Sequence, residues 1–232
     1  MLWLCVAVSS VSLQKRIVGG QNCRDDERLY HVTVIRHNNI IEVFCGGSLI
    51  SDQWVLTAGH CWESDPQWVL EAHVGVHPKS APKKIYRITQ LEVYRDRNGR
   101  YHDIMLLKLP VKVTTIQPIR LPDYLTCLRC FSSTVQDSPD DLQCAEFKIA
   151  KHEKLEKIEA KDRNFLRSYQ KWYSVQSSKR DTSRGDSGGG LVFKNRLYGV
   201  LSFLGDPDYA FIEPNGFMDV CAYKHWIDDT II

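Results

Sequence analysis

The chain lacks a charge excess of either sign. Its 30 Lys and Arg residues are matched by 28 Asp and Glu residues, so the formal net charge over 232 residues is only +2. A balance this even gives no bulk attraction toward nucleic acid or an anionic membrane. We therefore expect no nucleic-acid partner, and any other partner has to be recognised by individual sites.

The chain also lacks an apolar run long enough to cross a bilayer. The run from Leu2 to Val8 is short and is followed by small residues, which is typical of a secretory signal peptide, although the usual basic residues before it are missing. We expect a signal peptide over residues 1–12 and a secreted, extracellular protein with no membrane span. A buried N-terminal strand is the alternative.

A third absence concerns metal ligands. Cys127 and Cys130 form a C-x-x-C motif, but no second cysteine pair or histidine cluster stands at the spacing of zinc ligands, which disfavours a metal or redox centre. In an oxidising compartment the 8 cysteines indicate a disulfide framework instead. Setting aside Cys5 in the expected signal peptide leaves an odd number, so one cysteine lacks a partner.

Short β-rich runs fill the chain from Tyr30 to about Leu121 and return after Gly189, separated by Asn, Gly, Pro and Asp turn signals. This spacing predicts a sandwich or barrel, and the length suits one large all-β domain or two half-domains. The last residues, from Ala222 to Ile232, suit a short helix packed on the body.

One segment differs in character, from Gln143 to Lys171, where Lys and Glu are dense. Apolar side chains recur in it at roughly helical spacing, at Leu155, Ile158, Phe165, Tyr169 and Trp172. We expect one or two charged amphipathic helices here, whose polar face is solvated. An exosite for an acidic partner is the alternative.

Three separate motifs contain the parts of an activated serine. His60 lies in LTAGHC, Asp103 opens DIMLLKL, and Ser187 lies in RGDSGG. A serine hydroxyl needs an imidazole to take its proton and a carboxylate to orient that imidazole. Glycines around the serine let backbone N–H groups approach a substrate carbonyl. Each motif alone is an ordinary turn or strand end, so their combination carries the hypothesis.

Taken together and in this order, the motifs resemble the chymotrypsin-like serine proteases, from Ile17 to the C-terminus. The resemblance implies two six-stranded antiparallel β-barrels with a short C-terminal helix, over residues 17–232, with the boundary between the halves near residues 120–130. It implies that Ser187 attacks, His60 acts as base and Asp103 orients His60. The N–H groups of Gly185 and Ser187 would hold the oxyanion, with no metal or cofactor.

The segment KRIVGG is similar to the activation site of that family. The resemblance implies that residues 13–16 are a short activation peptide and that an activating protease cleaves after Arg16. The new amino terminus of Ile17 would then pair with Asp186, because a buried carboxylate needs such a partner. The implied partners are protein or peptide substrates, the activating protease, and inhibitors of the serpin or other types.

The resemblance also implies three disulfides, Cys23–Cys144, Cys45–Cys61 and Cys127–Cys221. Cys130 is then the unpaired cysteine, because its partner in the family would fall at Phe193.

Counting back from Ser187 places Asp181 at the floor of the primary specificity pocket, by resemblance to the trypsin-like members. A carboxylate there implies cleavage after Arg or Lys. The pocket walls depart from the family: Ser202, Phe203 and Leu204 stand in place of Ser-Trp-Gly, and Asn215 puts a side chain where glycine would leave room. A polar loop with a local ion pair is the alternative for Asp181.

These departures leave a second function open. The chain could be a catalytically impaired protease homologue that acts as a binding protein through its charged 148–180 segment. The complete set of His60, Asp103 and Ser187 with an intact activation site favours the secreted serine endopeptidase.

Overall fold

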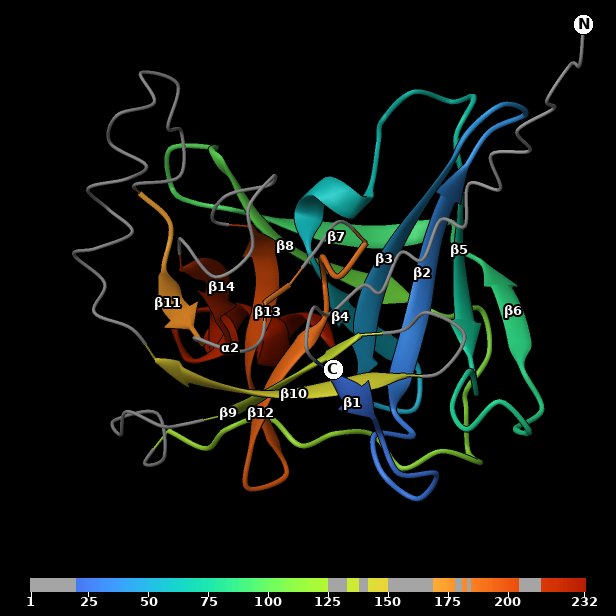
Figure 1. Cartoon of the computed structure of the whole chain (residues 1–232). Helices are drawn as coiled ribbons and strands as arrows, with labels where there is room; N and C mark the ends of the chain where they lie inside the picture. The colour runs from blue at the N-terminus through green and yellow to red at the C-terminus, as the bar shows by residue number, and fades with distance from the viewer. Residues whose placement is uncertain are drawn as a thin grey trace, which may run out of the picture.

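Two antiparallel sheets and the C-terminal helix make up nearly all the regular structure of the described residues (Figure 1). The structure is a computed structural model, and it describes residues 20–124, 133–137, 142–149, 169–177, 181–182, 185–204 and 214–232. In Figure 1 the strands of the N-terminal sheet run from blue to green on the right, and most strands of the C-terminal sheet run from yellow to red on the left.

The N-terminal sheet has seven strands in the order β6-β5-β2-β3-β4-β8-β7. They are β2 (His31–His37), β3 (Glu42–Leu49), β4 (Trp54–Thr57), β5 (Val69–Val74), β6 (Lys84–Arg87), β7 (Gln90–Arg95) and β8 (Tyr101–Lys108). The two edge strands, β6 and β7, are separated in the sequence only by Ile88 and Thr89. A sheet whose edges are joined by so short a link has to curl until they meet, which produces a barrel.

The C-terminal sheet also has seven strands, in the order β1-β10-β11-β14-β13-β12-β9, and β10 pairs with β9 as well, which closes it. They are β1 (Gln21–Asn22), β9 (Ser133–Asp137), β10 (Gln143–Ile149), β11 (Trp172–Gln176), β12 (Gly190–Phe193), β13 (Arg196–Phe203) and β14 (Asn215–Asp219). Helix α2 (Val220–Thr230) follows β14 directly, and the Asp219 side chain caps it by accepting from the Cys221 N–H.

The predicted two antiparallel barrels with a short C-terminal helix are confirmed, but each sheet has seven strands among the described residues instead of six. In the N-terminal half the run IYRITQLEV is not one strand, because it bends at Ile88 and contributes to both edges. In the C-terminal half the seventh strand is β1, whose two residues pair with Gln143 and Cys144.

The expected helix from Gln143 is wrong for its first seven residues, which form β10. Ala145 and Phe147 are buried while Glu146 between them is exposed, the two-residue alternation of a strand. Trp172, assigned to the same helical pattern, begins β11. Residues 150–168, the rest of the proposed helical segment, lie outside the described residues.

One large apolar cluster joins the two halves. It includes buried side chains of the N-terminal strands, such as Val34, Leu56 and Leu106, together with Val200 of β13 and Ile227 of α2. A smaller cluster fills the C-terminal sheet around Phe147 and Phe217. The sheets are therefore packed into a continuous core rather than held apart by a linker.

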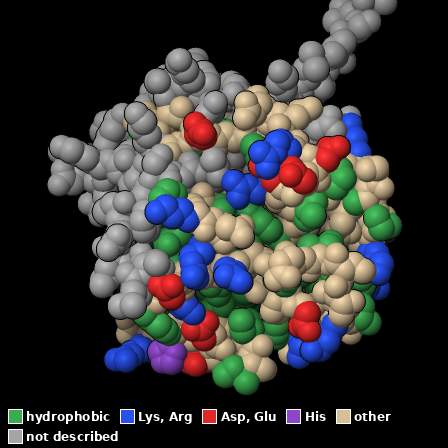
Figure 2. All heavy atoms as spheres, turned by 90° about the horizontal axis from the view of Figure 1, so that it is seen from below, with side chains coloured by type: hydrophobic (Ala, Val, Ile, Leu, Met, Phe, Trp, Pro, Cys, Tyr) green, Lys and Arg blue, Asp and Glu red, His purple; other side chains and the backbone are tan. Residues whose placement is uncertain are grey.

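The surface agrees with the balanced composition. On the face seen in Figure 2, basic and acidic side chains of the described residues are interspersed and not gathered into a single patch. Among the described residues, no helix is both long and apolar enough to span a membrane.

Two of the implied disulfides are confirmed, Cys23–Cys144 and Cys45–Cys61. Cys221 is also disulfide-bonded. Its expected partner Cys127, and Cys130, lie outside the described residues.

The sequence separation of the two described bridges leads to a stability prediction. Cys23–Cys144 spans 121 residues and Cys45–Cys61 spans 16. Because loop-closure entropy rises with loop length, replacing the first pair with alanines should lower the free energy of unfolding by about 4 to 5 kcal/mol and replacing the second by about 3 kcal/mol. Urea denaturation without reductant measures both. A larger loss for the shorter loop would contradict the prediction.

Candidate active site

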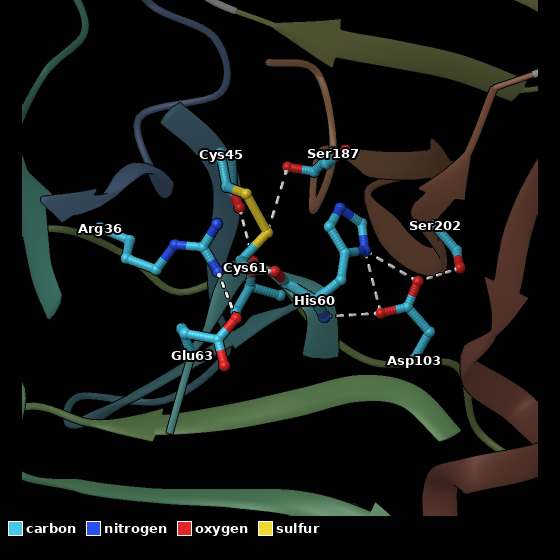
Figure 3. The surroundings of a disulfide bond; sticks show 10 residues. Arg36, Cys45, His60, Cys61, Glu63, Asp103, Ser187 and Ser202 are labelled. Atoms are coloured by element: carbon cyan, nitrogen blue, oxygen red, sulfur yellow. Dashed lines mark hydrogen bonds and ion pairs between the residues drawn. A yellow bond between two sulfur atoms is a disulfide. The ribbon is translucent and has the colours of Figure 1, made fainter. Parts of the chain in front are cut away.

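His60 is held in a short 3-10 turn, η1 (Gly59–Cys61), which follows β4. The Cys45–Cys61 disulfide ties this turn to β3 (Figure 3). On its other side the turn lies tightly against β8, since a Cβ added at Gly59 would lie 3.2 Å from the His102 carbonyl oxygen and 3.3 Å from Asp103 Oδ1. The glycine therefore lets the histidine turn rest directly on the strand that carries Asp103.

The carboxylate of Asp103 is 8% exposed and is surrounded by donors. His60 Nδ1 lies 3.0 Å from Oδ1 and 2.9 Å from Oδ2, and the His60 backbone N–H donates to Oδ1 at 2.8 Å. The hydroxyl of Ser202, on β13, donates to Oδ2 in a short hydrogen bond (Figure 3). A carboxylate next to Nδ1 fixes the proton on that nitrogen, so Nε2 remains as the basic nitrogen.

Ser187 lies in the turn before β12, and its backbone is bonded on both sides. The Gly46 N–H of β3 donates to the Ser187 carbonyl at 2.7 Å, and the Gly188 N–H donates to Leu201 O at 2.7 Å. Within the described ranges the N–H groups of Gly185 and Ser187 donate to no acceptor. An oxyanion requires two such donors that converge on it.

Figure 3 shows His60 between Asp103 on one side and Ser187 on the other. The structure brings the three predicted residues together from β8, η1 and the turn before β12. Within the described residues no hydrogen bond joins the imidazole to the Ser187 hydroxyl. In free enzymes this bond is often long, and it tightens when substrate binds.

A cavity of about 360 Å³ opens beside His60. Its lining includes Trp62, Tyr101, His102 and Gln170, so it is largely aromatic with a few polar groups. A cavity of this kind next to a basic imidazole suits a peptide side chain close to the reacting bond.

The donor sets of the described residues do not favour a metal. Two clusters of His, Cys and acidic side chains are compact enough to share an ion, Cys45–His60–Cys61 and Cys23–Glu27–Cys144. Both rely on cysteines that are already joined in disulfides, and a disulfide sulfur lacks the thiolate charge that a metal ligand needs.

Sequence reasoning missed the residues that support Asp103 from behind. Gln170 Oε1 accepts a hydrogen bond from the Asp103 backbone N–H at 2.8 Å, and Gln170 is 8% exposed. The Tyr223 hydroxyl of α2 accepts from the Lys171 N–H at 3.0 Å and is hydrogen-bonded to His102 Nδ1 at 2.6 Å. No signal in the sequence indicates these roles: His102 precedes the DIMLLKL motif, and Gln170 and Lys171 end the segment predicted to be helical.

Burial and neighbouring charges shift the pKa values of the residues in this supporting network. Burial lowers the pKa of His102, an effect that the nearby Asp96 carboxylate partly offsets. Burial pushes the pKa of Asp96 up, but hydrogen bonds from Arg100 and from backbone N–H groups outweigh it and bring that pKa to about 2. Burial also raises the pKa of Tyr223. Burial therefore favours the neutral form of His102, and the buried carboxylate next to His60 is that of Asp103.

Of the residues expected in the specificity pocket, Asp181 and Asn215 are in direct contact. Asp181 is 6% exposed, and its Oδ1 accepts from Asn215 Nδ2 at 2.6 Å. The ring of Phe203 fills the space beside Gly216, where an added Cβ would lie 2.0 Å from Phe203 Cζ. Leu204 packs against the smaller apolar cluster and is partly buried.

Of the activation residues, only Asp186 falls in the described part of the chain, and it is fully buried. Arg16 and Ile17 lie outside the described residues, so the cleavage site and its ion pair with Asp186 stay predictions.

Gly188 gives a test of how closely the serine turn fits the opposite barrel. It has a φ of 83°, and an added Cβ would lie 2.1 Å from Gly46 O and 2.3 Å from Thr57 Oγ1. Gly99 has a similar φ of 76° with nothing within 4 Å of an added Cβ, so it is the matched control.

Gly99→Ala should lower the free energy of unfolding by only about 1 to 2 kcal/mol, the strain of a left-handed alanine. Gly188→Ala adds a backbone clash, so it should lose at least about 2 kcal/mol more. Equal losses in urea denaturation would show that the turn is not packed as described.

Comparison with known proteins agrees with this geometry. A family model described as Trypsin matches residues 17–227. Serine protease 1 from Homo sapiens is 33% identical over 93% of this chain and 90% of its own length. Kallikrein 1-related peptidase b11 from Mus musculus is 29% identical over 100% of this chain and 97% of its own.

Solved structures show the same fold. Neuropsin, described as a serine protease expressed in the limbic system of mouse brain, superposes with a TM-score of 0.72 at 26% identity, over 92% of this chain and 99% of its own. With the histidine–aspartate pair and the serine turn assembled between two β-barrels, the chain belongs to the trypsin family of serine proteases.

Proposed function

We propose that the chain is a secreted serine endopeptidase, made as a zymogen, which hydrolyses peptide bonds after Lys or Arg. The observation that carries the proposal is the pairing of His60 Nδ1 with the buried Asp103 carboxylate at 2.9 Å, which leaves Nε2 directed away from the carboxylate. That pairing is required for an imidazole to take a proton from serine.

In the proposed reaction the Ser187 hydroxyl attacks the scissile carbonyl while His60 Nε2 takes its proton. The N–H groups of Gly185 and Ser187 stabilise the oxyanion, each by about 3 to 4 kcal/mol. His60 then gives the proton to the leaving amine, which breaks the peptide bond and leaves an acyl group on Ser187. Water, deprotonated by His60, hydrolyses this ester and restores the hydroxyl.

The proposed activation step follows from the burial of Asp186. A carboxylate with no exposed surface needs a cation or hydrogen bonds, because desolvation disfavours its charge. Cleavage after Arg16 would create an ammonium on Ile17, three residues before the first described residue. Its insertion beside Asp186 would order the turn that holds the Gly185 N–H.

The proposed preference for basic residues rests on Asp181, a buried carboxylate six residues before the nucleophile. A cationic side chain entering the pocket would gain a charge-assisted hydrogen bond from it. The proposed partners are protein or peptide substrates, the protease that cleaves after Arg16, and protease inhibitors of the serpin or other types.

The direct test is to cleave the purified chain after Arg16 and assay chromogenic peptides with Lys, Arg, Phe or Val before the reporter. We expect turnover only after cleavage, only for the basic peptides, and none for Ser187→Ala. A fluorophosphonate probe should label Ser187 in the same sample. Absence of both turnover and labelling would favour the catalytically impaired homologue that acts as a binding protein.

A second test concerns Asp103. Asp103→Asn presents an amide to His60 and favours the wrong imidazole tautomer, so kcat at pH 7 should fall about 10⁴-fold, as the corresponding change does in chymotrypsin-like enzymes. Asp96→Asn is the matched control, because this carboxylate lies against His102 and not against His60. It should change kcat less than about tenfold, within the range of an indirect electrostatic effect. Comparable losses would contradict the assigned role.

A further inference from the structure

The carboxylate of Asp181 already has a side-chain donor. Asn215 opens β14 and is 2% exposed, and its amide nitrogen lies 2.6 Å from Asp181 Oδ1. An amide oxygen that close to a carboxylate would be repelled, so the nitrogen has to face Asp181. The backbone N–H of Thr182 donates to the same oxygen at 2.9 Å. Two donors therefore occupy Oδ1.

Asn215 cannot easily withdraw from this position. Its backbone is paired with Val175 of β11, and the next residue, Gly216, is paired with Ser174. On the other side of β14 the Phe203 ring occupies the space next to Gly216, and that ring makes an edge contact with Trp172 at 5.3 Å between centroids. The strand is held from both neighbours, so the amide is a fixed part of the pocket floor.

Thr182, the residue after Asp181, adds a further polar group. Thr182 is 7% exposed, and its hydroxyl oxygen is buried with no hydrogen-bond partner in the described part of the chain. A buried hydroxyl left without a partner is unfavourable, so a ligand that bonds to it is favoured. Thr182 follows Asp181 directly, so its hydroxyl is an acceptor for a cation that this carboxylate binds.

Lysine and arginine make different demands on such a floor. A guanidinium is planar and binds a carboxylate best through two parallel N–H bonds, one to each oxygen. In this pocket, Asn215 and the Thr182 N–H already donate to Asp181 Oδ1, so they obstruct the second of the two guanidinium bonds. An ammonium is compact, needs only one carboxylate oxygen, and directs its other protons to neighbouring acceptors.

We propose that Asn215 makes this pocket select lysine over arginine in the residue before the scissile bond. The inference rests on the proposed peptidase function and deepens it, because it assigns the selection between the two basic residues to one amide side chain.

The test compares two peptides that differ only in Lys or Arg before the reporter, with the chain activated by cleavage after Arg16. We expect kcat/KM for the lysine peptide to be about tenfold or more above that for the arginine peptide, the discrimination given by one charge-assisted hydrogen bond. Asn215→Gly should raise kcat/KM for arginine and reduce the ratio at least about fivefold. Asn215→Ala removes the donor while keeping a Cβ, and it should move the ratio in the same direction.

Asn195→Gly is the matched control. Asn195 is an exposed asparagine in the turn between β12 and β13 with a φ of 57°, which glycine adopts readily, so the ratio should stay unchanged. An arginine peptide cleaved as fast as the lysine peptide by the unmodified enzyme would overturn the inference. A ratio unaffected by both Asn215 variants would do the same.

A binding measurement separates this inference from the proposed catalysis. The activated Ser187→Ala variant cannot form an acyl group, so calorimetry with n-butylamine and n-butylguanidine reports on the pocket alone. Tighter binding of n-butylamine, reversed or abolished by Asn215→Gly, supports the inference even if no peptide is turned over. Tighter binding of n-butylguanidine overturns it, and this result leaves the peptidase function intact if Ser187 of the unmodified, activated chain reacts with a fluorophosphonate.

Discussion

The geometry of the site depends on a single buried charge, the carboxylate of Asp103. Its desolvation is offset by donors from different parts of the fold: the imidazole and backbone of His60 in η1, and the hydroxyl of Ser202 on β13. These donors belong to opposite barrels, so the carboxylate is stable only when both barrels are folded and packed together. The alignment of the imidazole follows from this requirement.

The parts of the fold and site that the sequence predicted are those with local signatures. Alternating and continuous apolar runs fixed most strands, and the motifs around His60, Asp103 and Ser187 identified the site because each carries its own turn or strand signal. Gln170 and Tyr223 were not predictable, because their hydrogen bonds to Asp103 and His102 span 67 and 121 residues and depend on the assembled barrels.

The sequence-based prediction failed in the segment after Gln143, where the amino-acid composition and the alternation of side chains indicate different structures. The density of Lys and Glu after Gln143 favoured a helix, although the alternation of buried and exposed side chains around Glu146 is that of a strand. The strand count was likewise short because a bend inside an unbroken β-rich run, at Ile88, has no sequence signal of its own. Asn215 was recognised as an intruding side chain, but its bond to Asp181 required coordinates.

The hydrogen bond from Gly46 to the carbonyl of Ser187 has a mechanical consequence. Gly46 lies on β3, one residue after Cys45, whose disulfide anchors the histidine turn. The turn of the nucleophile and the turn of its base are therefore both attached to the same two residues of β3. A small movement of β3 would displace Ser187 and His60 in the same direction. Their separation therefore depends on β3 more than on how the two barrels are placed against each other.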